Sequence, residues 1–252
     1  MSHLFGALDR LSIAFFIEPT LHYLCSMQKV RLHDLGEKDY NEVWLLQKKI
    51  FQEAIDEKLN NKKPVQHLIV CEHPHVYTLG KNAQSSNLLL SEEELKSKSI
   101  SVYEIERGGD ITYHGPGQLV VYPIFDLEQL GLGVKKFVYL IEECIIQTLG
   151  DFGIMAERIE GRIGIWIDKD GMKERKIAAI GIKCSRHISM HGLALNVNTD
   201  MQLFNHIIPC GISDKAVSSM ELELSRKIEM TDVKELMLKK ISSTFGIHLD
   251  SV

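Results

Sequence analysis

The chain is organised around Arg107-Gly-Gly-Asp-Ile-Thr-Tyr-His-Gly-Pro-Gly-Gln-Leu-Val-Val-Tyr-Pro-Ile124, a glycine-rich stretch that runs directly into an apolar segment. Glycine lets a backbone turn sharply and lets a ligand approach it closely. Because Arg107, Tyr113 and His114 stand among the glycines, the stretch is interpreted as a loop that forms one wall of a ligand site. A long connecting turn between two strands is the alternative that these residues leave open.

The composition is that of an ordinary globular protein. The 252 residues are 44% hydrophobic and 25% charged, enough to bury one sizeable core, so we expect one main domain. A formal net charge of -5 argues against binding nucleic acid through a broad phosphate-neutralising surface. Five cysteines without a repeating spacing favour reduced thiols in a cytoplasmic protein over a disulfide framework. No apolar run is long enough to span a bilayer, so neither nucleic acid nor a membrane is an expected partner.

The beginning of the chain shows little pattern. Residues 1–28 are interpreted as an N-terminal extension: a disordered segment, a docking arm, or a consequence of where translation starts, since Met27 is a second candidate start. Residues 29–252 are predicted to form a single catalytic domain. A further boundary, if one exists, would fall after Cys210.

Three segments carry apolar residues at the spacing of an amphipathic helix. Asp39 is a candidate N-cap for the first of them, whose apolar face runs from Tyr40 to Ile55, and the others span residues 134–152 and 231–245. A shorter polar helix is predicted to begin near Ser91, because Glu94 completes a Ser-x-x-Glu capping box.

Strands are predicted in the middle of the chain. Residues 67–71 and 119–124 are short apolar runs typical of buried strands, and residues 101–106 alternate with a two-residue period. Residues 163–182 predict a hairpin, and residues 191–197 predict a further strand. Because helices flank these strands, the predicted fold class is α+β, a mixed sheet with helices packed on it.

The segment Cys71-Glu-His-Pro-His-Val-Tyr-Thr-Leu-Gly80 invites interpretation as a metal site because it contains Cys71, His73 and His75. No second Cys or His pair stands elsewhere at the spacing of a zinc finger or a zinc protease. We therefore expect a turn with polar edges here, and no metal.

Cys210 is the candidate nucleophile. It lies between Pro209, which fixes its own φ, and Gly211, which permits an unusual one, so the thiol can be held on a tight turn at the edge of a site. The alternative is a small buried hydrophobic residue, the usual role of a free cysteine. The remaining cysteines fit that role better because they lie in apolar or periodic runs: Cys25, Cys71, Cys144 and Cys184.

A nucleophilic cysteine needs a partner, because an unperturbed thiol pKa of about 8.5 leaves only a few per cent thiolate near neutral pH. The candidates are His114, His191, His206 and a lysine. His206 precedes Cys210 by four residues, but the intervening proline interrupts any helix that would align them. Lys176 begins an apolar strand that could carry its amine to a sheet edge beside a pocket. The alternative is a lysine that extends into water.

Four ordered motifs resemble those of the lipoyl(octanoyl) transferase family. They are Arg107–Gln118, Arg175-Lys-Ile-Ala-Ala-Ile-Gly181, His191-Gly-Leu-Ala-Leu-Asn196 and Pro209-Cys-Gly-Ile212. The match covers roughly residues 29–230, and Glu72–Gly80 adds to it. The resemblance implies the catalytic-domain fold shared by biotin protein ligases and lipoate ligases, a mixed sheet flanked by helices.

The resemblance also implies a reaction, the first step of endogenous protein lipoylation. An octanoyl or lipoyl group would pass from acyl carrier protein, through a thioester on Cys210, to a lysine of a lipoyl domain. The implied acceptors are the lipoyl domains of 2-oxoacid dehydrogenase E2 subunits and the glycine cleavage H protein. Lys176 is implied as the partner of Cys210, with no cofactor. The implied substrate contacts are Arg107, Gly108, Gly109, Asp110, Ile111, Thr112, Tyr113, His114, Ala179, Ile180, Gly181, Gly192, Leu193 and Ala194.

Three rival functions are weighed against this one. An ATP-dependent lipoate or biotin ligase would adenylate a free acid, but the chain has no Gly-Arg-Gly-Arg-type loop. A binding module or repressor is disfavoured because the N-terminal extension has no room for a helix-turn-helix domain. A Cys-His hydrolase with His114 or His191 as base would release the acyl group to water instead of to a lysine.

Overall fold

The computed structural model describes residues 28–169, 171–208 and 216–252, which form two sheets and the helices that cover them. The larger sheet has the order β12-β1-β2-β6-β10-β9-β8-β7, with β11 paired to β9. Its strands are β1 (Gln28–Glu37), β2 (Gln66–Glu72), β6 (Gln118–Ile124), β7 (Glu157–Ile159), β8 (Arg162–Ile167), β9 (Arg175–Ser185), β10 (Ile188–Asn196), β11 (Ala216–Val217) and β12 (Ile247–Ser251).

The pairing in this sheet is mixed. Strand β1 runs parallel to both β2 and β12, and β11 runs parallel to β9. The pairs from β2 through β6, β10, β9, β8 and β7 are antiparallel. The predicted mixed sheet and the predicted hairpin, formed by β8 and β9, are both confirmed.

A smaller sheet has the order β4-β3-β5. Its strands are β3 (Val76–Leu79), β4 (Ser101–Glu104) and β5 (Ile111–His114). Two expectations were therefore wrong in part: β3 lies where a turn with polar edges was expected, and β5 lies inside the expected glycine-rich loop. Both strands have four residues, and all four residues of β3 are buried, so no alternation of polar and apolar residues marks it.

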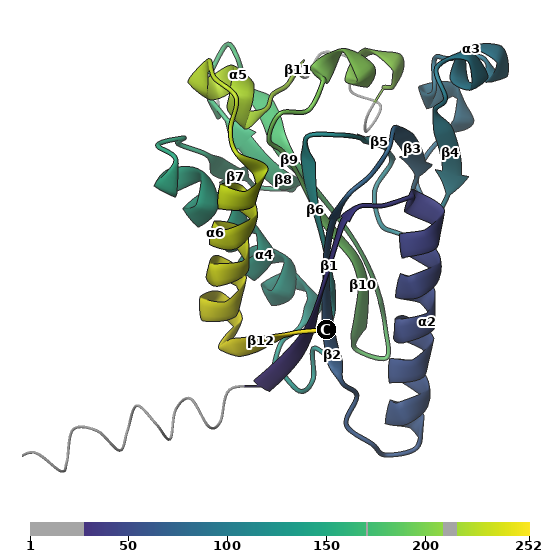
Figure 1. Cartoon of the computed structure of the whole chain (residues 1–252), viewed down its shortest axis with the longest axis vertical. Helices are drawn as coiled ribbons and strands as arrows, with labels where there is room; N and C mark the ends of the chain where they lie inside the picture. The colour runs from purple at the N-terminus through teal and green to yellow at the C-terminus, as the bar shows by residue number, and fades with distance from the viewer. Residues whose placement is uncertain (1–27, 170, 209–215) are drawn as a thin grey trace, which may run out of the picture.

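Helices cover both faces of the larger sheet. They are α2 (Tyr40–Leu59), α3 (Glu92–Ser97), α4 (Val134–Asp151), α5 (Met220–Leu224) and α6 (Met230–Phe245), with 3-10 turns η1 (Ser85–Asn87) and η2 (Met201–His206). Figure 1 shows α2 on one side of the strands and α4 and α6 on the other.

The helix boundaries follow from local chemistry. The carboxylate of Asp39 accepts hydrogen bonds from the backbone N–H groups of Asn41 (2.9 Å) and Glu42 (3.2 Å), so it caps α2 as predicted. The Ser91 and Glu94 capping box of α3 is formed in both directions. Gly246, in the left-handed conformation, ends α6.

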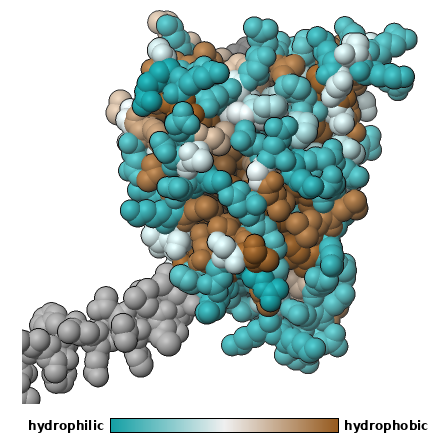
Figure 2. Space-filling view, viewed as in Figure 1, coloured by the Kyte–Doolittle hydropathy of each residue, from teal (hydrophilic) through white to brown (hydrophobic). Residues whose placement is uncertain are grey.

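Strand β6 lies in the centre of the core and is buried along its whole length, as expected. Because successive side chains point to opposite faces, Val120 and Tyr122 pack with α2, whereas Leu119 and Val121 join the core beneath α4 and α6. Figure 2 shows a largely hydrophilic surface in this view, with apolar side chains gathered over the central strands between the helices.

Residues 1–27, which make up nearly all of the predicted extension and include Cys25, lie outside the described residues, and Gln28 already belongs to β1. Among the described helices, none combines the length and the apolar character that a bilayer crossing requires.

Candidate functional site

A cavity of about 510 Å³ is lined by both sheets and by α4. Its wall includes Arg107 to Thr112 from the glycine-rich stretch and, from β9 and β10, Lys176, Ala179 to Ile182, Ala194 and Asn196. The apolar side chains in its wall are Val134, Val138, Ile163, Trp166, Phe204, Ala216 and Val217, and Asn82, Gln118, Gly161 and Arg162 complete the lining. Three of the four motifs therefore meet at one largely apolar cavity.

Lys176 lies near the start of β9 and lines this cavity. The expectation of a sheet edge was wrong, because β9 is an interior strand on which Lys176 pairs with Trp166 on one side and Val217 on the other. Its Nζ donates to the carbonyl oxygen of Ile163 (3.3 Å) and lies 4.6 Å from the centroid of the Trp166 ring. The lysine side chain is thus partly exposed, with its amine against a carbonyl oxygen and an aromatic face.

Gly164 makes room for the lysine. It has a φ of +120°, and a Cβ at this position would lie 2.7 Å from the carbonyl oxygen of Ala178 and 3.2 Å from Cε of Lys176. A larger residue on β8 would therefore displace the lysine side chain from its place above Trp166.

Arg107 is a structural clamp as well as a cavity wall. The side chain is 8% exposed, and its guanidinium donates to the carbonyl oxygen of Thr78 (2.7 Å), to Thr78 Oγ1 (3.0 Å) and to the carbonyl oxygen of Gly108 (3.1 Å). Gly181 passes so close that a Cβ there would lie 2.9 Å from Arg107 Cδ and 3.0 Å from the carbonyl oxygen of Gly108. The glycine of the β9 motif thus lets the first motif pack against the strand.

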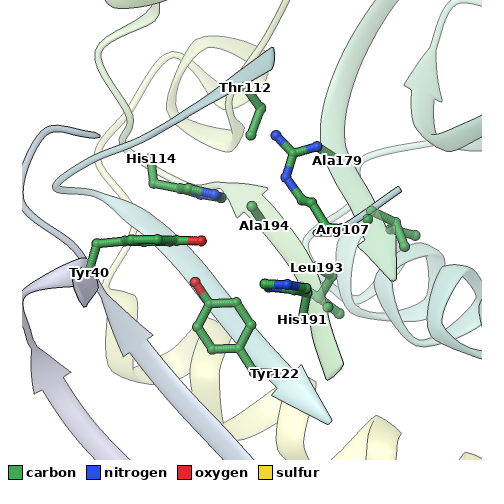
Figure 3. A pocket seen from close by; sticks show the side chains of 12 residues that line it. Tyr40, Arg107, Thr112, His114, Tyr122, Ala179, His191, Leu193 and Ala194 are labelled. Atoms are coloured by element: carbon green, nitrogen blue, oxygen red, sulfur yellow. The ribbon is translucent and has the colours of Figure 1, made fainter. Parts of the chain in front are cut away.

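A second, smaller cavity of about 50 Å³ adjoins the first. The residues that line both are Arg107, Thr112, Ala179, Ile180, Gly181 and Ala194. The rest of its wall comes from Tyr40, His114, Tyr122, His191, Gly192 and Leu193. Figure 3 shows the Tyr40, His114, Tyr122 and His191 side chains around this space.

A buried hydrogen-bond chain holds His114. Asn196 Nδ2 donates to the carbonyl oxygen of Ser218 (3.0 Å), Gln118 Nε2 donates to Asn196 Oδ1 (2.8 Å), and Gln118 Oε1 faces His114 Nδ1 at 2.7 Å. Since Gln118 Oε1 can only accept, His114 Nδ1 carries the proton. Burial lowers the pKa of His114 to about 3, so the imidazole is neutral near pH 7.

The histidine and cysteine of the segment 71–75 are also internal. His73 Nδ1 donates to the carbonyl oxygen of Lys38 (2.7 Å), and its Nε2 accepts from the Tyr122 hydroxyl (2.8 Å). Burial lowers the pKa of His73 to about 4 and raises the pKa of the Cys71 thiol. Among the described residues, no group of three or more His, Cys, Asp or Glu side chains is arranged to hold a metal ion.

Of the predicted substrate contacts, all but Tyr113 line one of the two cavities. Tyr113 is fully buried, and its hydroxyl meets His75 Nδ1 at 2.7 Å, because side chains alternate along β5 and Tyr113 faces away from the cavities. His206 lies in η2 and lines neither cavity. Cys210, with Pro209 and Gly211, lies outside the described residues.

Sequence reasoning missed several lining residues. Tyr40 was interpreted as part of an apolar helix face, and Tyr122 as part of an apolar strand. A phenol inside a buried strand needs a hydrogen-bond partner, and that requirement was the signal available at Tyr122. For Val134, Val138 and Phe204 the sequence holds no such signal, because they reach the cavity only through the packing of α4 and η2.

Known proteins share both the sequence and the fold. The model of the lipoyl protein ligase A/B catalytic domain matches residues 39–242. The octanoyltransferase of Cytophaga hutchinsonii is 48% identical over 233 residues, which cover 89% of this chain and 96% of the relative.

Two solved structures show the likeness of fold. The structure of a bi-partite lipoate protein ligase and its E2 lipoyl domain from Thermoplasma acidophilum matches with a TM-score of 0.67 at 16% identity, over 90% of this chain and 88% of that chain. The biotin protein ligase of Aquifex aeolicus in complex with biotin and ATP matches with a TM-score of 0.51 at 14% identity, over 86% and 70%. The expected fold is thereby confirmed. The chain belongs to the lipoyl protein ligase A/B catalytic domain family and, within it, to the octanoyltransferases.

Proposed function

We propose that the protein transfers an octanoyl group from acyl carrier protein to a lysine of a lipoyl domain, with Cys210 as the nucleophile and Lys176 as the proton acceptor. The observation that carries the proposal is the largely apolar cavity of about 510 Å³ with the Lys176 amine in its wall. Membership of the octanoyltransferases supports the choice of acyl group.

The first step is an exchange of thioesters. The Cys210 thiolate attacks the octanoyl carbonyl carbon, the carbon–sulfur bond to the carrier breaks, and the carrier thiolate leaves and takes up a proton. One thioester replaces another, so the acyl group stays activated at nearly equal energy. Backbone N–H groups in the glycine-containing turns are candidate donors to the oxyanion that forms during the attack.

The second step forms an amide. The neutral amine of the acceptor lysine attacks the Cys210 thioester, the Cys210 thiolate is expelled, and the proton on the attacking nitrogen passes to the Lys176 amine. Conversion of a thioester to an amide is downhill and needs no ATP. The face of Trp166 then stabilises the Lys176 ammonium that results, by about 0.5–2 kcal/mol for a cation over an aromatic ring.

The cavity suits a medium-length alkyl chain. Each buried CH₂ contributes about 0.8 kcal/mol, so an octanoyl group gains several kcal/mol from an apolar wall. Extended, with bonds of about 1.5 Å, the chain spans roughly 9 Å. At about 3.3 Å per residue, Ala179 lies roughly 10 Å along β9 from Lys176 and Gly181 roughly 17 Å, so a chain whose carbonyl end lies at the amine ends near Ala179.

The proposed partners follow from the same reaction. Octanoyl-acyl carrier protein is the donor, and lipoyl domains of 2-oxoacid dehydrogenase E2 subunits and the glycine cleavage H protein are the acceptors. We further propose that residues 29–252 act as one catalytic domain and that the protein works in the cytoplasm, where its cysteines stay reduced.

The rival hydrolase mechanism is disfavoured. Burial lowers the pKa of His114 and that of His191 each to about 3, which makes both imidazoles poor acceptors of a thiol proton. Both side chains also line the small cavity instead of the larger one that contains Lys176.

Intact-mass measurement tests the nucleophile. The protein is incubated with octanoyl-acyl carrier protein in the absence of ATP, and we expect one octanoyl group on the wild type and none on Cys210→Ser. Absence of an adduct on the wild type, or an adduct that persists on Cys210→Ser, would contradict the proposal. Cys184→Ser is the control and should acylate like the wild type, since Cys184 is half-buried on the same strand as Lys176 but lines neither cavity.

A further inference from the structure

The small cavity differs in chemistry from the apolar cavity beside it. Its wall carries the hydroxyls of Tyr40 and Tyr122 and the imidazoles of His114 and His191. Figure 3 shows these four side chains pointing toward one common space, with Arg107 and Thr112 on one side of it. Of these four side chains only His114 was expected to contact the substrate, and none of the four takes part in the reaction steps proposed above, so their polarity needs a separate explanation.

Two of the four groups can act only as acceptors toward the chamber. His114 Nδ1 donates to Gln118 Oε1, so in the neutral ring Nε2 is left as an acceptor. His73 Nδ1 donates to the carbonyl oxygen of Lys38, so His73 Nε2 accepts the Tyr122 proton. Because its only proton is donated to His73, the Tyr122 hydroxyl can act only as a hydrogen-bond acceptor toward a group in the chamber.

His191 lies in the wall of the chamber and has an unfavourable backbone conformation. It is 2% exposed, and its Nε2 has no hydrogen-bond partner among the described residues. Its φ is +62°, in the left-handed region, and its backbone N–H leaves the sheet to donate to Gln47 Oε1 of α2 (3.2 Å). A buried polar atom without a partner is destabilising, which points to an occupant of the chamber that pairs with it.

The occupant must be a hydrogen-bond donor. Two fixed acceptors face it, and the Tyr40 hydroxyl and His191 Nε2 can each donate or accept. A cavity of about 50 Å³ is large enough for water, and buried water typically makes two to four such bonds. A neutral hydroxyl meets the same requirements, whereas an alkyl group would leave His191 Nε2 without a partner.

We propose that the chamber is a subsite for a neutral hydrogen-bond donor at the far end of the acyl chain: water beside an octanoyl group, and the terminal hydroxyl of an ω-hydroxyacyl group in its place. The inference rests on the proposed function, in which the acyl carbonyl lies near Lys176 and the chain runs along β9. The chamber shares Ala179 to Gly181 with the cavity, and that chain ends near Ala179, the first of these residues.

Matched acyl groups test the subsite. Transfer to a lipoyl domain is measured for octanoyl-acyl carrier protein and for two matched pairs of acyl groups on the same carrier. The pairs are 8-hydroxyoctanoyl with nonanoyl, and 9-hydroxynonanoyl with decanoyl. The two members of a pair have equal numbers of chain atoms, because a terminal CH₂OH in one replaces a terminal CH₂CH₃ in the other. We expect the hydroxylated member to be used at least as well as its alkyl match in one or both pairs. A purely apolar pocket would penalise the hydroxyl roughly 10- to 100-fold in kcat/KM.

Variants assign the effect to the chamber. In Tyr40→Phe/Tyr122→Phe the ratio of hydroxyacyl to alkyl transfer should fall about tenfold or more, because two of its hydroxyls are gone. Tyr103→Phe is the matched control, since Tyr103 stacks on Tyr40 (ring centroids 5.4 Å apart) but lies outside the chamber, and its ratio should equal that of the wild type. The ratio compares two substrates on one preparation, so a partly folded variant does not distort it.

The outcomes separate the subsite from the reaction. Octanoyl transfer combined with a tenfold or greater penalty on the hydroxyl in both pairs overturns the subsite and leaves the proposed function standing. A ratio that the double variant does not change also overturns the subsite. Absence of octanoyl transfer by the wild type overturns both.

Discussion

At the scale of single residues, the position of the Lys176 amine matters for the proposed proton transfer. The amine lies in the wall of the apolar cavity, donates to the carbonyl oxygen of Ile163 and lies over the face of Trp166. In the proposed mechanism it takes up a proton when the amide forms and loses that proton before the next transfer.

Substitution of Lys176 should therefore slow amide formation. We expect Lys176→Ala to lower kcat for transfer to a lipoyl domain by about 10²- to 10⁴-fold, the usual contribution of a positioned acid–base group. Lys176→Arg should be no better, because a guanidinium does not give up its proton. Single-turnover transfer measures both.

Lys173→Ala is the control, since Lys173 is exposed on the β8–β9 connection three residues away. It should transfer at the wild-type rate. A wild-type rate for Lys176→Ala would assign proton acceptance to another group.

The buried histidines make stability depend on pH. Burial lowers the pKa of His73 to about 4 and the pKa values of His114 and His191 to about 3, whereas an unfolded imidazole titrates near 6.5. As the pH falls, these imidazoles bind protons in the unfolded chain but stay unprotonated in the folded protein. The stability from each neutral ring is complete above about pH 6.5 and is lost as the pH falls toward 3–4, by about 2 kcal/mol per histidine at pH 5.

His73→Gln isolates one of these contributions. The glutamine amide can donate to Lys38 and accept from Tyr122 as the imidazole does, but it does not titrate. Between pH 6 and pH 5 the free energy of unfolding in urea should fall by about 1 kcal/mol less for the variant than for the wild type. Parallel curves would show that His73 takes up a proton in the folded protein.

The sequence indicated the motif residues but not their orientations. Lys176 and the Arg107 stretch were recognisable because lysine is unusual at the start of an apolar strand and because glycines cluster around the arginine. Tyr113 was expected at the ligand site and faces the opposite side of β5, since the four-residue strand within the loop was not recognised. Side chains alternate between the two faces of a strand, so a strand that is not recognised leaves some of its side chains assigned to the wrong face.

At the scale of elements, β9 connects the functional parts. It carries Lys176 at its start and Gly181 five residues later, where the strand touches the clamp formed by Arg107. The cavity exists because the glycine-rich stretch rests directly on this strand. Its shape therefore depends on a close backbone approach that only a residue without a side chain permits.

A methyl group at position 181 should force these elements apart. In Gly181→Ala the new Cβ would meet Arg107 Cδ and the carbonyl of Gly108, and the clamp is fixed by hydrogen bonds to Thr78. We expect a loss of about 1–3 kcal/mol in the free energy of unfolding, typical of an overpacked interior, together with a raised KM for the acyl donor. Urea denaturation and steady-state kinetics measure the two effects.

Gly150→Ala provides the matched control. Gly150 lies in α4 with no atom within 4 Å of a Cβ built on it, so alanine should stabilise the helix by roughly 0.5–1 kcal/mol. Equal effects of the two substitutions would contradict the close packing of the Arg107 stretch on β9.

The elements that sequence reasoning found are those with a long local signal. Helices α2, α4 and α6 repeat apolar residues over 16 to 20 positions, and α3 carries a capping box. Strands β3 and β5 have four residues each, and β12 has five, too few to show a period. Two strands of the smaller sheet were missed for that reason, whereas β4 was predicted from the alternation of residues 101–106.

At the scale of the whole molecule, the first and last described strands lie side by side. Strand β12 pairs in parallel with β1, from Gln28 opposite Ile247 to Leu32 opposite Ser251. Ile247 is fully buried in the core beneath α4 and α6. The C-terminal strand thus closes the core at one edge of the sheet, far along the sheet order from β9.

Ile247→Ala should therefore destabilise the fold without altering the site. A buried Ile→Ala change costs about 2–5 kcal/mol, and we expect a loss in that range in urea denaturation with normal activity of the molecules that remain folded. Leu249→Ala, on the same strand but only partly buried, should cost clearly less. A smaller effect at Ile247 than at Leu249 would contradict the position of β12.

The fold class was predictable at this scale, whereas the cavity was not. Alternating strands in the middle and helices at the flanks suffice for an α+β assignment. The cavity forms where the two sheets and α4 meet, and it joins residues as distant in sequence as Asn82 and Val217. No local pattern encodes such a meeting, and only the resemblance between motifs indicated which segments come together.

The central claim is that the acyl group is bound covalently to the protein before it is transferred to a lysine of a lipoyl domain. The direct measurement is a chase: the octanoylated protein is freed of carrier and mixed with a lipoyl domain without ATP, and the mass of both proteins is followed. We predict that the octanoyl group leaves the enzyme and appears on one lysine of the lipoyl domain. An octanoyl group that stays on the enzyme, or is released as free octanoate, would contradict the account.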